Sequence, residues 1–492
     1  MQDRKARDIN HRGVSKPSGW MLPTSISGLH SNVAHFLASR SPRPTFKSEE
    51  WENRSLAGAM GNYALELFSA DKRQIFFSAK GLPPSEFLTV FRPCDRAYPS
   101  FTSGIEDSDE PYIPSLSYVV SVPKLTERLD VMGFTRQRLE EHVQRRLNAD
   151  QKDLDGRIEH YEQEGSSSIP SYYRQLKRQR RTLEQFTLRR WVNSMRDLRT
   201  REGLSPFLVP KRSMKALTSL QRHMLNADEE YEWYYFGLPV TDLRFLLRAV
   251  LLCGDADENV FLDLTEIEND YFTEGDEPVQ DALAETIRMG RVCEKILVLT
   301  EGRTDTRILS KSLAILYPHL ADLYSFLDYE AFNLGGGTGN LASLVKGLAG
   351  VGIGNRVIAV FDNDSAGAVQ ANDVRKLNLP DNFRILTLPH LTFAKRYPTV
   401  GPNGTLRTDI NGRACGIELY LGTAALTRED GSLTPVQWGG YEAKVKRYQG
   451  ELTDKKGVEE RFLKSIEGPQ LPDEANLTAI RAVLQMMFTA FA

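Results

Sequence analysis

The stretch Lys295-Ile-Leu-Val-Leu-Thr-Glu301-Gly302 is an apolar run that ends in an acid, and Arg356-Val-Ile-Ala-Val-Phe-Asp362-Asn-Asp364 repeats this pattern about sixty residues later. Both runs are rich in β-branched residues and show no alternation of apolar and polar positions. Such runs are typical of strands that are buried on both faces of a parallel sheet. The sequence therefore predicts two parallel strands, each followed at once by carboxylates.

The acids at these strand ends predict a metal site. Ligands of parallel sheets collect at the carboxyl ends of the strands. Glu301, Asp362 and Asp364 would meet there, and their charges repel unless a cation lies among them. Asp305 lies one helical turn beyond Glu301 and would face the same ion if a helix begins near Arg303. We therefore expect Mg²⁺ or Mn²⁺ beside a phosphate.

The glycine-rich run and the acids also have other interpretations. The run Phe332-Asn-Leu-Gly-Gly-Gly-Thr-Gly339 predicts another strand end that turns into a helix, with glycines that allow close approach of an anion. It is neither a Walker A loop, because no Gly-Lys-Ser/Thr follows, nor a complete dinucleotide fingerprint. A simpler alternative stays open, in which Asp364 or Ser365 caps the next helix and Glu301 is an exposed loop acid.

Residues 292–392 resemble a Toprim domain, the metal-binding fold of topoisomerases, bacterial primases and OLD-type nucleases. The resemblance is carried, in order, by the Glu301-Gly302 turn, the glycine-rich run and Asp362-x-Asp364-x-x-Gly367. It implies an α/β fold with a four-stranded parallel, Rossmann-like sheet. It also implies that these acids bind one or two divalent ions for phosphodiester chemistry.

The Glu301/Asp305 pair is closer to the OLD-type nucleases than to topoisomerases. By this resemblance, Lys395 or Arg396 lies where a basic transition-state helper is expected, and Glu418 lies where a late acidic ligand is expected. Ordinary surface charges are the alternative for these three residues.

The preceding region resembles the HEPN/Toprim-associated N-terminal domain of bacterial conflict systems. The resemblance rests on Met60-Gly, on Arg128-Leu-Asp-Val-Met-Gly-Phe and on Leu262-Asp-Leu-Thr. We expect a small β-containing unit at 60–134, followed by a mainly α-helical HEPN-like region at 135–290 with Thr135 as an N-cap. The strands predicted in the small unit are Tyr63–Phe68, Gln74–Ser78 and Tyr118–Val122.

The helical segment Tyr172 to Arg201 carries ten Lys or Arg and only two Asp or Glu. It predicts a phosphate-binding face, although a solvated helix face is the common alternative. The residues of this face are Arg174, Lys177, Arg178, Arg180 and Arg181. The spacing of Arg136 and His142 fits the Arg-x4–6-His pattern of HEPN ribonucleases, but the pattern is weak, and a degenerate nucleic-acid-binding or dimerising helical domain is the alternative.

The composition of the whole chain excludes several classes of protein. The 492 residues carry a net charge of −3, which excludes a generally basic coat protein, and the four cysteines form no Cys-x-x-Cys pair. No apolar stretch has the length of a membrane span, so we expect a cytoplasmic protein without membrane contact. Residues 1–58 read as a mobile extension and 393–492 as a C-terminal helical extension.

These observations predict a metal-dependent nuclease that acts on nucleic acid, with RNA such as transfer RNA slightly favoured over DNA. A role in anti-phage defence is implied by the family resemblance alone. The alternatives are a non-catalytic nucleic-acid sensor and a metal-independent HEPN ribonuclease. The sequence leaves open whether the chain forms a homo-oligomer or binds a regulatory partner protein.

Overall fold

A computed structural model describes residues 62–69, 72–80, 83–97, 116–163, 170–200, 217–230, 236–272, 276–288, 295–402 and 404–491. The chain divides into two units, Met1–Ala59 and Met60–Ala492. The extension predicted at 1–58 lies outside the described residues. Within the described ranges, no helix combines the length and the apolar character that a membrane span requires.

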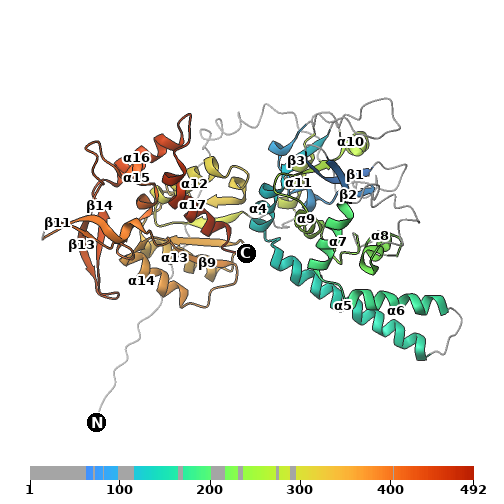
Figure 1. Ribbon diagram of the computed structural model, residues 1–492. Helices are drawn as coiled ribbons and strands as arrows, with labels where there is room; N and C mark the ends of the chain where they lie inside the picture. The colour runs from blue at the N-terminus through green and yellow to red at the C-terminus, as the bar shows by residue number, and fades with distance from the viewer. Residues whose placement is uncertain are drawn as a thin grey trace, which may run out of the picture. The chain divides into compact units, whose positions relative to one another are not determined.

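An antiparallel sheet of four strands organises the N-terminal part of the second unit (Figure 1). Its order is β2-β1-β4-β3, and the strands are β1 (Asn62–Ser69), β2 (Lys72–Lys80), β3 (Ser117–Ser121) and β4 (Asn259–Asp263). The three strands predicted here are confirmed. However, β4 pairs with both β1 and β3, so the units predicted at 60–134 and 135–290 share one sheet. The predicted boundary at 134 is wrong, because the short strand β4 had not been recognised.

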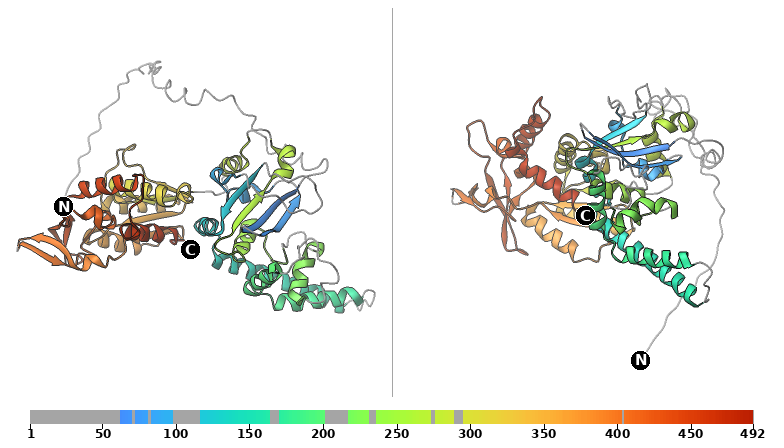
Figure 2. Two further views of the ribbon diagram at one scale, coloured as in Figure 1. Left: turned by 45° about the horizontal axis from the view of Figure 1, so that its top comes forward. Right: turned by 45° about the vertical axis from the view of Figure 1, so that its right-hand side comes forward.

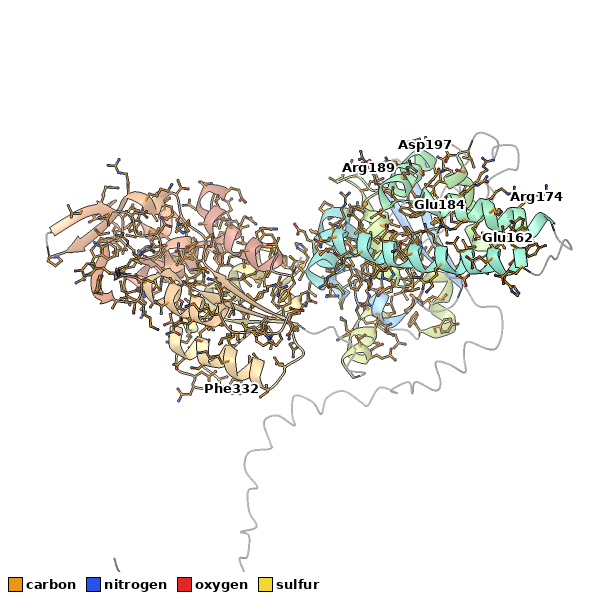
Figure 3. The ribbon with its side chains drawn as sticks, turned by 90° about the horizontal axis from the view of Figure 1, so that it is seen from below. Glu162, Arg174, Glu184, Arg189, Asp197 and Phe332 are labelled. Carbon is orange, nitrogen blue, oxygen red and sulfur yellow. The ribbon has the colours of Figure 1, made fainter. Side chains whose placement is uncertain are left out.

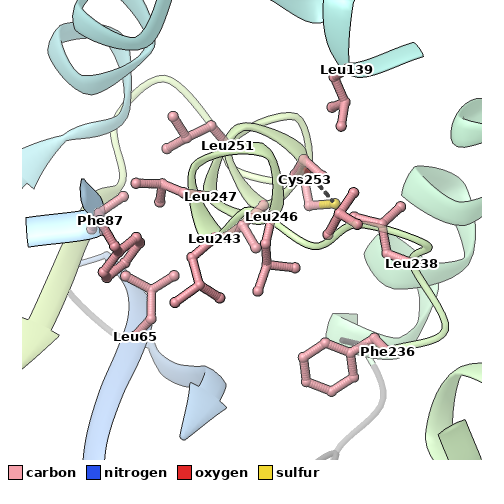
Figure 4. Close-up of a cluster of buried hydrophobic side chains, with 14 of the residues drawn as sticks. Leu65, Phe87, Leu139, Phe236, Leu238, Leu243, Leu246, Leu247, Leu251 and Cys253 are labelled. Carbon is pink, nitrogen blue, oxygen red and sulfur yellow. Dashed lines mark hydrogen bonds between the residues drawn. The ribbon is translucent and has the colours of Figure 1, made fainter. Parts of the chain in front are cut away.

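Helices surround this sheet. They are α3 (Ser85–Leu88), α4 (Val122–Met132), α5 (Arg136–Gln163), α6 (Pro170–Glu184), α7 (Leu188–Thr200), α8 (Ser219–Glu230), α9 (Leu243–Leu251), α10 (Thr265–Tyr271) and α11 (Pro278–Arg288). Helix α9 is buried along most of its length, and its leucines lie near Leu65 and Phe87 (Figure 4). Thr135 caps α5 as predicted, since its hydroxyl accepts from the Arg138 amide at 3.3 Å.

The helical region after α5 is also as the sequence indicated. The predicted segment Tyr172 to Arg201 corresponds to α6 and α7, which are separated by a short turn. Five apolar residues of this segment form its buried side: Leu176, Leu183, Phe186, Met195 and Leu198. Helices α5 and α6 lie side by side in both views of Figure 2.

A parallel sheet of four strands forms the second α/β region. Its order is β6-β5-β7-β9, from β5 (Ile296–Leu299), β6 (Tyr324–Phe326), β7 (Val357–Phe361) and β9 (Phe383–Thr387). Ile358 and Val360 of β7 share a core with α12 (Arg303–Leu316), whereas the alternate positions of β7 share another with α13 (Thr338–Gly350) and α14 (Ser365–Arg375). Both faces are therefore covered, which explains the apolar runs without alternation.

The C-terminal region corrects the prediction of a helical extension. Residues 397–452 contain the sheet β11-β10-β13-β14, formed by β10 (Tyr397–Gly401), β11 (Gly404–Thr408), β13 (Val436–Glu442) and β14 (Arg447–Leu452). Helices α15 (Thr423–Leu426), α16 (Lys455–Ile466) and α17 (Glu474–Phe488) accompany it. The sequence pair Asn403-Gly404, a strong hairpin signal, joins the segments of β10 and β11, and Gly404 is the first residue of β11.

Candidate functional site

The two acidic signatures meet at one edge of the parallel sheet. Glu301 follows β5, and Asp362 follows β7, its parallel neighbour. Glu301 Oε1 accepts a hydrogen bond from the backbone amide of Asp362 at 2.9 Å. The structure thus brings together two of the acids that were predicted to share a site.

Two further predicted acids join them from other elements. Asp305 lies in the first turn of α12, where Oδ2 accepts from the Gly302 amide at 2.9 Å. Glu418 is buried in the 3-10 helix η5 (Ile417–Tyr420). A Cβ atom at Gly416 would lie 2.7 Å from Glu418 Oε2 and 3.3 Å from Asp362 Oδ2, so both carboxylates approach the same glycine.

Asp364 is buried and serves as the N-cap of α14, as the simpler interpretation proposed. Its Oδ1 accepts from the Gly367 amide at 2.6 Å, and its Oδ2 accepts from the side-chain amide of Gln449 in β14. Gly367 explains the spacing of the motif, because a Cβ at this position would overlap the carbonyl oxygen of Asp362.

The five acids form one electrostatic unit, which we call the acid pocket: Glu301, Asp305, Asp362, Asp364 and Glu418. Burial raises the pKa of Glu301 to about 8, and the charges of Asp364 and Asp305 add to this shift. Burial and the charge of Glu418 raise the pKa of Asp305 to about 7. The pKa of Asp362 is also raised, by burial first and then by Asp305 and Glu301. Carboxylates this close together repel each other when ionised, and a nearby positive charge would stabilise their ionised forms.

Lys455 at the start of α16 supplies one such charge. Burial lowers its pKa, but attraction to Glu418, Glu451 and Asp362 outweighs burial, so the pKa of Lys455 is raised. Lys455 was not predicted from the sequence. Nothing in Asp454-Lys455-Lys456-Gly457 distinguishes it from ordinary surface lysines, because its role depends on how α16 packs.

The basic residues predicted by resemblance are placed differently. Lys395 and Arg396 lie in the 3-10 helix η4 (Phe393–Arg396), and both are exposed. In the described part of the chain, Lys395 forms no ion pair with the acid pocket. The charges of the pocket acids act on Lys455 instead, which is itself exposed and pairs with Glu451 of β14 at 3.7 Å.

The glycine-rich run contacts the pocket through its backbone. Strand β6 ends at Phe326, earlier than the sequence indicated, and helix α13 begins at Thr338. The Gly337 amide donates to the carbonyl oxygen of Glu301 at 2.6 Å, and a Cβ at Gly336 would lie 3.0 Å from that oxygen. These glycines thus permit close approach to the strand end that carries Glu301.

The fit of a divalent cation rests on the chemistry of the donors. All five are carboxylates, the ligands that Mg²⁺ and Mn²⁺ prefer. Within the described residues, no group of three or more His, Cys, Asp or Glu side chains is already arranged to hold a metal ion. Instead, Glu301, Asp305 and Asp364 accept from backbone amides. The five carboxylates are suitable ligands for such a cation. Their side chains would have to rotate toward the cation in order to bind it.

Residues 73–287 match the family model described as HEPN/Toprim N-terminal domain 1. The chain carries a HEPN/Toprim N-terminal domain. This domain indicates a nuclease-associated role, and the match runs through the boundary that we had predicted at residue 134. No curated protein and no solved structure matches the chain.

Arg136 and His142 lie on α5 of the HEPN/Toprim N-terminal domain, but the structure does not bring them together. Six residues correspond to about 120° around a helix, so they occupy different faces. Arg136 is exposed and pairs with Glu140 at 3.0 Å. His142 stacks on Phe245 with ring centroids 4.7 Å apart, and burial lowers its pKa.

The predicted phosphate-binding face on α6 is partly neutralised within the same domain, and Figure 3 shows Arg174 of α6 and Glu162 of α5 on neighbouring helices. Lys177 pairs with Glu162 of α5 at 3.1 Å, and Arg180 pairs with Asp155 at 2.7 Å. Arg174, Arg178 and Arg181 are exposed. Nucleic-acid binding by this face stays a prediction.

Proposed function

We propose that this chain is a divalent-cation-dependent nuclease of the Toprim type, whose acid pocket lies at the ends of β5 and β7. One observation carries the proposal: five carboxylates from separate segments gather at one sheet edge with raised pKa values. Ordinary helix capping explains Asp364 but not the burial of Glu418 beside Asp362. The nuclease-associated role indicated by the N-terminal domain supports the same conclusion.

In this proposal, each residue of the site has a separate role. Glu301, Asp305, Asp362, Asp364 and Glu418 would hold one or two Mg²⁺ or Mn²⁺ ions. When bound, such ions polarise a phosphate and lower the pKa of a water molecule. Lys455 would neutralise negative charge that develops on the phosphate oxygens. Gln449 holds Asp364 and so positions it.

The substrate is nucleic acid, with RNA slightly favoured over DNA because of the HEPN-associated region. We propose a role in anti-phage defence on the family resemblance alone. Lys395, the first choice for the basic helper, is replaced in this proposal by Lys455. The metal-independent alternative is less supported, since Arg136 and His142 lie apart.

A cleavage assay tests the proposal. The full chain would be incubated with labelled single-stranded and duplex RNA and DNA, with Mg²⁺, Mn²⁺ or EDTA. We expect cleavage with metal and none with EDTA, and the double variant Asp362→Ala, Asp364→Ala should lose at least about 100-fold in rate. The control is Asp381→Ala, which removes an exposed carboxylate from the loop before β9. Cleavage that persists in the double variant would overturn the proposal.

A further inference from the structure

The hairpin of β13 and β14 is joined directly to the acid pocket. Gln449 of β14 donates its side-chain amide to Asp364, and its Oε1 accepts from the amides of Ser365 and Ala366 at 3.0 and 3.2 Å. The backbone oxygen of Tyr448 accepts from Ser365 Oγ at 3.1 Å. Two consecutive residues of β14 therefore hold the turn that carries Asp364.

An exposed aromatic pair lies on this hairpin. Tyr441 of β13 and Tyr448 of β14 are cross-strand partners, and their ring centroids lie 5.1 Å apart with an edge-to-face orientation. The two residues are 56% and 60% exposed. Large aromatic surfaces are thus presented to solvent on the strand whose Gln449 holds Asp364, with the Tyr448 ring on the opposite face of the strand from the Gln449 side chain. Ring faces of this kind can stack on nucleobases.

Positive charge accompanies the aromatic pair. Lys444, Lys446 and Arg447 lie between the two tyrosines in the sequence, together with Glu442. Lys444 also pairs with Asp373 of α14 at 3.2 Å. All three cations are exposed. The Arg447 guanidinium donates to the carbonyl oxygen of Gly412 at 3.4 Å, and Gly412 in turn hydrogen-bonds to Asn363, between the two pocket aspartates. Cationic side chains thus extend from the hairpin turn to the strand end.

We propose that the β13–β14 hairpin is a binding surface for single-stranded nucleic acid and leads it to the acid pocket. The proposal rests on the proposed function and adds the class of substrate. Lysines and arginine attract phosphates, and the tyrosine rings stack on bases. Unpaired bases offer their faces to side chains, whereas bases within a duplex already stack on each other. The combination of rings and cations therefore selects single strands.

The aromatic pair also has a purely structural explanation, since cross-strand aromatic pairs stabilise hairpins. Two matched double variants separate the roles. Tyr441→Leu with Tyr448→Leu keeps an apolar cross-strand contact and removes the flat rings. Tyr441→Phe with Tyr448→Phe keeps the rings and removes only the hydroxyl groups.

The test is fluorescence anisotropy on the full chain with labelled twenty-residue oligo-dT and oligo-U and with a duplex of the same length, in EDTA to prevent cleavage. We expect tighter binding of the single strands than of the duplex. The leucine pair should weaken single-strand binding at least about tenfold, and the phenylalanine pair should leave it unchanged. Lys444→Ala with Lys446→Ala should lower the salt dependence of binding.

Thermal unfolding of each variant shows whether it is folded, and the lysine variants test the surface independently of the tyrosines. Equal affinity of the parent and both the leucine and lysine variants, or preference for the duplex, would overturn the proposal. The variant Asp362→Ala, Asp364→Ala should bind but not cleave. If the parent binds single strands through the hairpin but never cleaves them, the proposed binding surface is supported and the proposed nuclease activity is contradicted.

Discussion

Lys455 is the residue whose position most changes the interpretation of the acid pocket. The charges of Glu418, Glu451, Asp362 and Asp305 raise its pKa despite partial burial, and its ammonium group lies 3.7 Å from a carboxylate oxygen of Glu451. A positive charge beside these acids can act on a phosphate that enters the acid pocket. Lys395 of η4 is exposed, as Lys455 is, but within the described residues it forms no ion pair with an acid.

This contrast gives a first prediction. Lys455→Ala should lower kcat by about 100-fold, because charge on the phosphate oxygens loses its partner. Lys395→Ala is the matched control and should stay within about twofold of the parent, as surface substitutions usually do. Steady-state cleavage rates in Mg²⁺ decide between them, and a large loss with Lys395→Ala alone would reverse our assignment.

The raised pKa values predict how the metal-free protein responds to pH. The pKa of Glu301 rises from an ordinary 4.5 to about 8, so the folded state binds more protons than the unfolded state between these values. Its stability should then fall as pH increases through this window. We expect the Tm in EDTA to decrease from pH 5 to pH 8, and Mg²⁺ to restore it at pH 8 by favouring the charged carboxylates.

The variant Glu301→Gln, which cannot ionise, provides the control for this experiment and should flatten the profile. A metal-free Tm that rises over the same range would show that the acids are not crowded as described.

The sequence indicated which acids lie in the acid pocket, but it did not indicate which other residues contact them. Glu301 and Asp362 could be predicted because each follows directly on a strand, and parallel strand ends meet. Lys455 and Gln449 could not, because they reach the pocket through the packing of α16 and β14, which no local pattern encodes. Asp364 has both roles that were weighed, as a helix cap and as a neighbour of the other acids.

At the scale of elements, the turn from β7 into α14 depends on one glycine. A Cβ at Gly367 would overlap the Asp362 carbonyl oxygen and lie 3.1 Å from Asp364 Oδ1. Gly367→Ala should therefore destabilise the fold by about 1–3 kcal/mol and disturb the pocket. Gly347→Ala in α13 is the control, since a Cβ there meets nothing within 4 Å. It should stabilise by about 0.4–1 kcal/mol.

Urea denaturation of the two variants measures these free energies of unfolding. Equal stability of Gly367→Ala and the parent would mean that the turn has room for a Cβ atom at this position, which contradicts the described geometry.

Elements with local signals were predicted, and elements that depend on distant partners were not. The strands β5 and β7 carry continuous apolar runs, and α12 begins at Arg303 as expected. Strand β4 was missed because its partners β1 and β3 lie far away in the sequence. Strands β13 and β14 were missed because their side chains are mostly polar or exposed, and the few buried positions, such as Val436 and Leu452, form no regular apolar alternation.

At the scale of the whole molecule, the question is which part carries the chemistry. The HEPN/Toprim N-terminal domain contains His142 stacked on Phe245, away from the face of Arg136. We predict that His142→Gln keeps cleavage within about twofold of the parent, while EDTA abolishes it. Cleavage that ignores EDTA and disappears with His142→Gln would assign the chemistry to the N-terminal domain instead.

The most direct test of the account is a calorimetric titration of the full chain with Mn²⁺. We predict saturable binding to the parent and to the control Asp381→Asn, and loss of this binding when Glu301→Gln is combined with Asp362→Asn. Equal Mn²⁺ binding by the parent and by this double variant would contradict the account, because the cation would then be held elsewhere.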